Sequence, residues 1–178
     1  MAQIVDSYSE SNSDTETNYT DYHGYLFGQS FTGDGGTLNS IKAYLKRSGA
    51  FANNIYIYVF AHSGTYGTSS VPTGSVLATS DAVNSSTINT SLGLVTFNFS
   101  GANKITLTNG IYYTFYVLID SGGSFATNIV YGGSDSSSPS HSGNLFYDGG
   151  GGYVASSGED LCFYVYKDDS PNYLGKQW

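Results

Sequence analysis

Asn54-Ile55-Tyr56-Ile57-Tyr58-Val59-Phe60-Ala61 is the stretch of this chain that decides its fold. Successive side chains of a β-strand point to opposite faces, so the aliphatic residues of this stretch share one face and its aromatic residues share the other. Residues 111–119 and 161–166 repeat the alternation. We therefore predict strands whose aliphatic face packs on a core. The tyrosine-bearing face is then either buried as well or forms an aromatic binding surface.

Turn signals rich in Gly, Asn and Asp separate further strand-like segments along the chain. Asn109-Gly110, which lies between the apolar residues 105–107 and 111–113, predicts a short hairpin. The spacing predicts an all-β, antiparallel jelly-roll β-sandwich with about ten strands. The predicted strands are 25–31, 38–47, 54–61, 75–82, 94–100, 104–107, 111–120, 128–131, 144–148 and 160–167.

The length of 178 residues is typical of one domain with a well-buried core. We expect the β-sandwich domain over 25–167, preceded by an N-terminal arm or first strand at 1–24 and followed by a C-terminal tail at 168–178. The polar residues 7–22 are expected to form a long loop or a mobile arm. Two stretches rich in Gly and Ser, 131–143 and 148–158, are expected to form surface loops at one end of the sandwich.

Composition and charge exclude several partners. Only 11% of the residues are charged, against about a quarter in ordinary domains, and the net charge is −8. Nucleic-acid binding needs a concentrated positive field, so we expect no nucleic-acid partner, and we expect no membrane insertion. Cys162 is the single cysteine, so no intrachain disulfide can form, and its mid-strand position predicts a buried structural thiol. No signal peptide is recognisable, which favours synthesis in the cytoplasm.

The sequence gives little support to catalysis. The chain has three glutamates, two of which lie in the polar N-terminal stretch, and its three histidines do not have the spacing of metal ligands. It also lacks the Gly-x-Ser-x-Gly elbow of serine hydrolases. We expect that this protein is not an enzyme, and calcium is the one cofactor that the sequence suggests.

The turns of this chain could hold calcium, because turns rich in Asp and backbone carbonyls offer the hard oxygen ligands that this cation prefers. The candidate ligands are Asp34, Glu159 and Asp160. The competing interpretation is that they are ordinary turn residues that cap the backbone, and this is the commoner role of aspartate in turns.

The tyrosines are candidates for glycan binding. Sugar rings have an apolar C–H face and a rim of hydroxyls, so their sites combine aromatic rings with polar neighbours. Core packing or a subunit interface would also explain the tyrosines, and these roles are commoner. Two sites are expected. Tyrosines on neighbouring strands would form a flat aromatic platform for sugar rings, and residues on either side of the glycine run 149–152 would form a site in a loop. The candidates are Tyr44, Tyr56, Tyr58, Tyr112 and Tyr116 for the platform, and Tyr147, Asp148 and Tyr153 for the loop site.

The order of several motifs resembles the choice-of-anchor type of jelly-roll domain, which occurs in surface proteins and in viral and phage proteins. The resemblance covers about residues 25–167. It implies a non-catalytic module similar in fold to carbohydrate-binding modules, and it implies no defined site residues. The motifs are GQSFT at 28–32, LNSIKAYLKR at 38–47, IYIYV at 55–59, VPTGSVLA at 71–78, VTFNF at 95–99, LTNGIYY at 107–113 and DLCFYVY at 160–166.

We therefore expect a non-catalytic structural or binding module that is displayed on a virion or another extracellular particle, such as a phage head or tail. Its expected partners are other particle proteins or further copies of itself, together with cell-surface glycans. A free-standing carbohydrate-binding module is the alternative.

Overall fold

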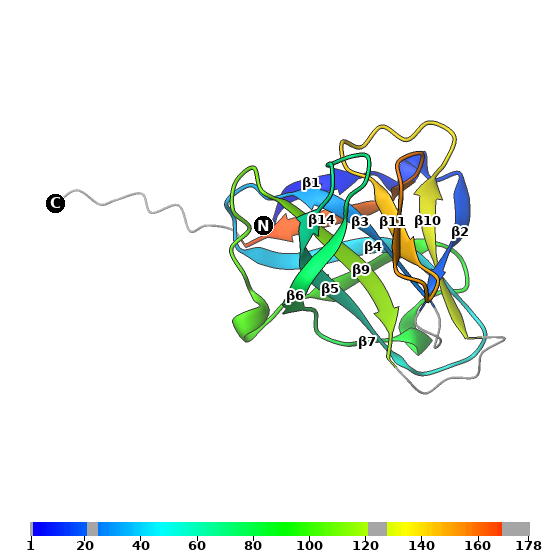
Figure 1. The fold of residues 1–178 in the computed structure, drawn as a ribbon. Coiled ribbons are helices and arrows are strands. Elements are labelled where there is room, and N and C mark those ends of the chain that lie inside the picture. The colour runs from blue at the N-terminus through cyan, green and yellow to red at the C-terminus, as the bar shows by residue number, and fades with distance from the viewer. Residues whose placement is uncertain (1, 21–24, 121–127, 169–178) are drawn as a thin grey trace.

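The predicted pair of antiparallel sheets is present in the computed structural model, which describes residues 2–20, 25–120 and 128–168 (Figure 1). The two sheets pack against each other, so the all-β class and the sandwich architecture are confirmed. Of the predicted C-terminal tail, residues 169–178 lie outside the described residues, as do residues 21–24 of the N-terminal segment and the predicted turn at 121–123.

Sheet A is built around the long strand β4. The strand order is β1-β14-β4-β10-β13, with β2 paired to β10 and β8 paired to β4. The strands are β1 (Gln3–Tyr8), β2 (Thr15–Thr20), β4 (Leu38–Ser48), β8 (Gly93–Asn98), β10 (Ile129–Asp135), β13 (Asp160–Leu161) and β14 (Phe163–Lys167).

Sheet B has the order β12-β11-β3-β9-β5-β6, with β7 paired to β5. Its strands are β3 (Leu26–Thr32), β5 (Asn54–Ser63), β6 (Val71–Thr79), β7 (Val83–Asn84), β9 (Tyr112–Ile119), β11 (Leu145–Asp148) and β12 (Tyr153–Ser156). In the described connections lie three short 3-10 helices: η1 (Glu10–Asn12), η2 (Ser85–Thr87) and η3 (Gly101–Asn103).

The core lies between the sheets and follows the alternation of the strands. The ring of Phe115 in sheet B lies 5.4 Å from the ring of Phe163 in sheet A, so the two sheets are in direct contact. Cys162 is fully buried, as predicted, and burial raises the pKa of its thiol to about 12. The thiol therefore stays protonated at neutral pH. The alternation predicted these inward-facing core residues: Ile55, Ile57, Val59, Phe115, Val117, Leu161, Phe163 and Val165.

Two strands occupy the N-terminal stretch, most of which we expected to be a loop or an arm. β1 pairs with β14, and the polar β2 pairs with β10. β2 has no apolar alternation to reveal it, because it is held by the backbone ladder to β10 and by peripheral contacts such as the ion pair between Glu16 and Lys46.

The prediction of a hairpin around Asn109-Gly110 is wrong. Residues 104–107 form one isolated bridge, Thr37 to Thr106, and β9 pairs instead with β3 and β5. The turn itself is present, with Gly110 at a φ of +74°. The two predicted Gly/Ser loops are shorter than expected, because β10 extends to Asp135 and β12 follows the glycine run.

Candidate binding face on sheet B

The outer face of sheet B carries the rings that the alternation directs away from the core. Cross-strand pairing sets Phe146, Gly28, Tyr116 and Tyr58 in one row, because residues opposite each other in a ladder share a face. Rings above and below this row complete the surface. We call this surface the aromatic face; it consists of Tyr56, Tyr58, Phe60, Tyr116, Phe146 and Tyr153.

The rings of the aromatic face contact one another in an unbroken series. The ring centroid of Tyr116 lies 5.5 Å from that of Tyr58 and 5.0 Å from that of Phe60, with Phe60 stacked on it. Tyr153 lies 6.4 Å from Tyr116 and meets Phe146 edge-on at 5.9 Å. These spacings are those of favourable aromatic pairs, so each ring fixes the orientation of the next.

The aromatic face has a buried base and an accessible surface. Phe146 is 0% exposed, and Phe60 and Tyr116 are below 10%, so these rings support their neighbours. Tyr153 is 39% exposed, and Tyr56 and Tyr58 are half-buried. A ligand that approached the face would therefore meet the rings of these three tyrosines.

The hydroxyls of Tyr58, Tyr116 and Tyr153 keep their protons at physiological pH, because burial raises the pKa of each. Burial, and then the nearby Tyr153 and Tyr58, raise the pKa of Tyr116. Burial, and then the carboxylate of Asp148, raise the pKa of Tyr153. Protonated phenols both donate and accept hydrogen bonds, so the rim of the face suits hydroxyl-bearing ligands.

The glycine run places Asp148 beside Tyr153. The two residues are opposite each other in the β11–β12 ladder and so share a face of the sheet. Asp148 Oδ1 accepts hydrogen bonds from the N–H groups of Gly150 (2.7 Å) and Gly152 (3.0 Å), which fixes the loop. The predicted loop site and the predicted platform therefore meet, because Tyr153 contacts Tyr116.

Three of the predicted tyrosines lie elsewhere. Tyr147 pairs with Val154 on the opposite face of the hairpin from Tyr153. Tyr44 lies on β4, in sheet A, so its strand is not a neighbour of the others. Tyr112 is on the outer face of sheet B, but its ring stacks on Tyr66 at 3.9 Å and forms a separate group.

Sequence reasoning missed three aromatic residues of this face of the sheet: His62, Tyr66 and Phe146. Tyr66 and His62 complete the group around Tyr112, with the His62 ring 5.5 Å from Tyr112. Tyr66 lies in the turn between β5 and β6, where no periodic pattern could reveal its position. Phe146 carried a signal, since it alternates with the core residue Leu145, and the same kind of pattern places Phe60 on the outer face.

The three predicted calcium ligands do not form one site. Asp34 accepts a hydrogen bond from the ammonium of Lys167 at 2.6 Å, and Glu159 accepts one from the Ser134 hydroxyl at 2.8 Å. Asp160 is buried, and burial raises its pKa. Within the described parts of the chain, no three residues of the types His, Cys, Asp and Glu are grouped so that they could hold a metal ion.

A buried polar network ties β1, β3 and β13 to the loop before β11. Gln29 donates to Asp160 Oδ1 at 2.9 Å, and its Oε1 accepts from the N–H of Leu161 at 2.9 Å. The N–H of His141 donates to Asp160 Oδ2 at 2.9 Å. Asp160 therefore has two donors where its charge is desolvated, as a buried carboxylate requires.

The ring of His141 has a fixed tautomer. Its Nδ1 accepts from the N–H of Gly143 at 3.0 Å, so this nitrogen carries no proton. The proton is therefore on Nε2, which donates to Asp6 Oδ1 at 3.0 Å. A histidine that acts as a general base needs a free acceptor nitrogen, whereas Nδ1 is already used. In this arrangement the residue joins chain segments.

Tyr8 makes a second buried contact with a carboxylate, and this contact depends on pH. Its hydroxyl donates to Asp135 Oδ2 at 2.6 Å, and this bond is the main reason why the pKa of Asp135 lies below its ordinary value. A lowered carboxyl pKa stabilises the fold at neutral pH, and the stabilisation is lost as the pH falls through the lowered pKa. We expect Tyr8→Phe to lower the urea midpoint clearly at neutral pH.

The same deficit should shrink in acid, below the ordinary aspartate pKa of about 4. Urea titrations of both proteins at neutral and acid pH measure it, with the exposed Tyr147→Phe as the matched control. A deficit of equal size at both pH values would contradict the charge-assisted bond.

No protein-family model matches the sequence, and no match to a curated protein was found. Among the described residues, no helix is long and apolar enough to cross a membrane.

Proposed function

We propose that this protein is a non-catalytic binding module, displayed on a virion or another extracellular particle, that binds glycans through its aromatic face. The observation that carries the proposal is the series of contacting rings on the outer face of sheet B. This series ends in a tyrosine that is 39% exposed and lies beside the carboxylate of Asp148.

The chemistry of the face matches a polysaccharide. Tyr56, Tyr58 and Tyr153 offer ring surface for the C–H faces of successive sugars, and the tyrosine hydroxyls and Asp148 offer hydrogen-bonding partners for the sugar hydroxyls. The buried base holds the rings in place before a ligand arrives, so little side-chain entropy is lost on binding.

The hydrogen bonding of His141 supports a non-catalytic role. Both ring nitrogens already have partners within the protein, and Asp6 and Asp160 are part of the same network. These groups connect loops and strands. Their hydrogen bonds within the protein explain their positions, and no catalytic role is needed to explain them.

The particle-borne location is supported by the resemblance to choice-of-anchor jelly rolls and by the low content of charged residues, 11%. Other particle proteins or further copies of the chain would then hold the module in place. A free-standing carbohydrate-binding module would use the same face, and the two roles differ in whether purified particles contain the chain.

Affinity electrophoresis in gels that contain single soluble polysaccharides tests the proposal. We expect at least one polysaccharide to retard the wild-type protein, and Tyr58→Ala and Tyr153→Ala each to weaken binding about tenfold, because each removes a stacking ring. Tyr44→Ala is the matched control, since this tyrosine lies in sheet A, and it should bind as the wild type does. Unchanged retardation of Tyr153→Ala, or no retardation by any polysaccharide, would refute glycan binding by this face.

A further inference from the structure

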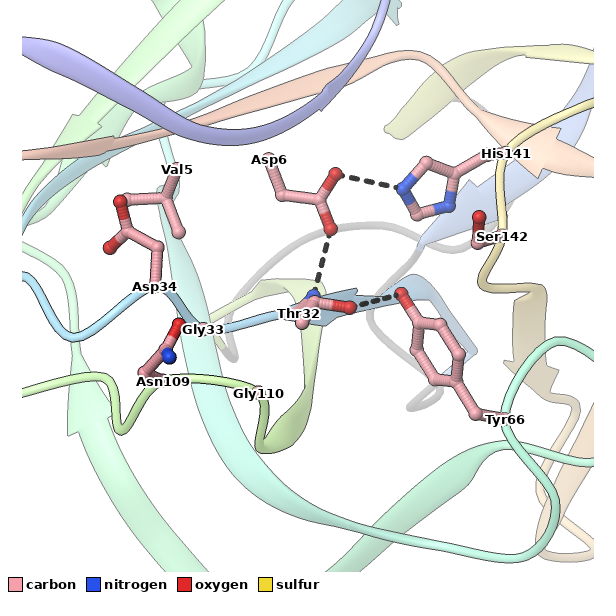
Figure 2. A pocket seen from close by; sticks show the side chains of 10 residues that line it. All are labelled: Val5, Asp6, Thr32, Gly33, Asp34, Tyr66, Asn109, Gly110, His141 and Ser142. Carbon is pink, nitrogen blue, oxygen red and sulfur yellow. Dashed lines mark hydrogen bonds and ion pairs between the residues drawn. The ribbon is translucent and has the colours of Figure 1, made fainter.

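A pocket of about 350 Å³ lies where five separate segments of the chain meet (Figure 2). It shares no residue with the aromatic face. Its walls come from β1, the end of β3 with the turn after it, the β5–β6 turn, the turn before β9 and the loop before β11. The residues that line it are Val5, Asp6, Thr32, Gly33, Asp34, Tyr66, Asn109, Gly110, His141 and Ser142.

Asp6 holds the walls of this pocket together. Its Oδ1 accepts from the N–H of Ser7 (2.8 Å) and from Nε2 of His141 (3.0 Å), and its Oδ2 accepts from the N–H of Thr32 (2.8 Å). One carboxylate thus joins β1, β3 and the loop before β11, as Figure 2 shows for two of these bonds. The pocket is therefore formed before any ligand binds.

The lining offers both donors and acceptors of hydrogen bonds. Thr32 Oγ1 donates to the Tyr66 hydroxyl at 3.0 Å, which leaves the hydrogen of that hydroxyl for another acceptor. Asp6 Oδ2 accepts one bond from the protein and has a second lone pair. The amide of Asn109 and the hydroxyl of Ser142 add groups that can both donate and accept.

The two carboxylates of the pocket already have partners within the protein. Lys167 Nζ pairs with Asp34 at 2.6 Å, and the ring Nε2–H of His141 donates to Asp6 Oδ1 at 3.0 Å. An anion would be repelled by the carboxylates of Asp6 and Asp34. A cation would compete with Lys167 and His141, which already bind these carboxylates. The pocket therefore favours a neutral ligand.

The ring of Tyr66 supplies a rigid aromatic surface. It stacks on Tyr112 at 3.9 Å with an interplanar angle of 8°, which fixes its orientation. Burial raises the pKa of Tyr66 to about 12, so its hydroxyl keeps its proton at neutral pH. The volume lies near the lower end of the range for small-molecule sites, about 300–1,000 Å³, which suits a single ring.

We propose that this pocket binds one neutral polyhydroxylated ring, a monosaccharide or a terminal sugar, with Tyr66, Asn109 and Asp6 as its hydrogen-bonding partners. This site lies outside the aromatic face, and it depends on different residues. It goes beyond the proposed function because it can exist whether or not the aromatic face binds polysaccharide.

NMR titration of ¹⁵N-labelled protein with free glucose, galactose, mannose and N-acetylglucosamine tests the proposal. We expect at least one of these sugars to shift the amide signals of Thr32, Gly33 and Gly110, with an affinity that does not change with salt. Tyr66→Phe keeps the ring and removes the hydroxyl, so it should weaken binding about threefold to tenfold. Asn109→Ala, at a separate wall, should also weaken binding.

Tyr153→Phe is the matched control, because it removes a hydroxyl from the aromatic face, and it should leave these shifts unchanged. If no sugar shifts the pocket amides, or if Tyr66→Phe and Asn109→Ala bind as the wild type does, the assignment is wrong. Binding of the cationic amino sugar glucosamine alone, lost on addition of salt, would also overturn it. Polysaccharide retardation that depends on Tyr58 and Tyr153 would leave the proposed function intact in each of these cases.

Discussion

Gly28→Ala is expected to lower the free energy of unfolding by about 3 kcal/mol or more. A Cβ at this position would lie 1.9 Å from the carbonyl oxygen of Phe115, 2.6 Å from Cζ of Phe146 and 2.8 Å from Cα of Tyr116. Two of these atoms belong to the backbone of β9, which cannot retreat without breaking its ladder to β3. Phe146 is 0% exposed and covers the glycine, so its ring has no free space to enter.

Urea unfolding followed by far-ultraviolet circular dichroism measures this loss. Gly93→Ala in β8 is the matched control, because a Cβ there would meet nothing within 4 Å, and it should unfold within about 1 kcal/mol of the wild type. A Gly28→Ala protein as stable as Gly93→Ala would mean that Phe146 does not lie over Gly28, and the buried base of the aromatic face would be wrong.

Gln29→Leu is expected to cost about 3 kcal/mol of stability at neutral pH, because it leaves a buried charge with one donor fewer. Gln29 is 0% exposed and satisfies both Asp160 Oδ1 and the N–H of Leu161. Leucine has a similar volume, so the loss would come from the unsatisfied polar groups and not from a cavity.

The loss in Gln29→Leu should depend on pH. Burial raises the pKa of Asp160, and the bond from Gln29 opposes this rise, so the variant should have a still higher pKa. Stability that depends on a protonated carboxyl is lost as the pH rises, so the deficit should be largest at neutral pH and smaller in acid.

Urea midpoints at both pH values measure the deficit of Gln29→Leu. Gln3→Leu, the same substitution at an exposed position, is the control and should be nearly neutral. If Gln29→Leu were as stable as Gln3→Leu, the network around Asp160 would not be as described.

The sandwich could be predicted because its central strands alternate so regularly. Ile57 and Val59 could be assigned to the core, and Tyr58 to the outer face, from local sequence alone. β2 could not, because its polar residues carry no alternation and its position depends on pairing with a strand more than a hundred residues away. The hairpin at Asn109-Gly110 failed for the same reason, since β9 found partners distant in sequence.

The aromatic face could be predicted only in part. Alternation gave the side of the strand on which Tyr58 and Tyr116 lie, but it could not give the sheet to which a strand belongs, so Tyr44 was grouped with them. The meeting of Tyr153 with Tyr116 depends on the β11–β12 hairpin folding beside β3. Tyr66 and the pocket that it lines depend on five converging segments, which no local pattern encodes.

The central claim is that the aromatic face is an open ligand surface and not a contact between copies of the chain. Light scattering over a range of protein concentrations tests it most directly, with the wild type, Tyr58→Ala and Tyr153→Ala compared. The account predicts the mass of a single chain for all three proteins. A stable wild-type oligomer that both substitutions dissociate would contradict the account and would assign these tyrosines to a subunit interface.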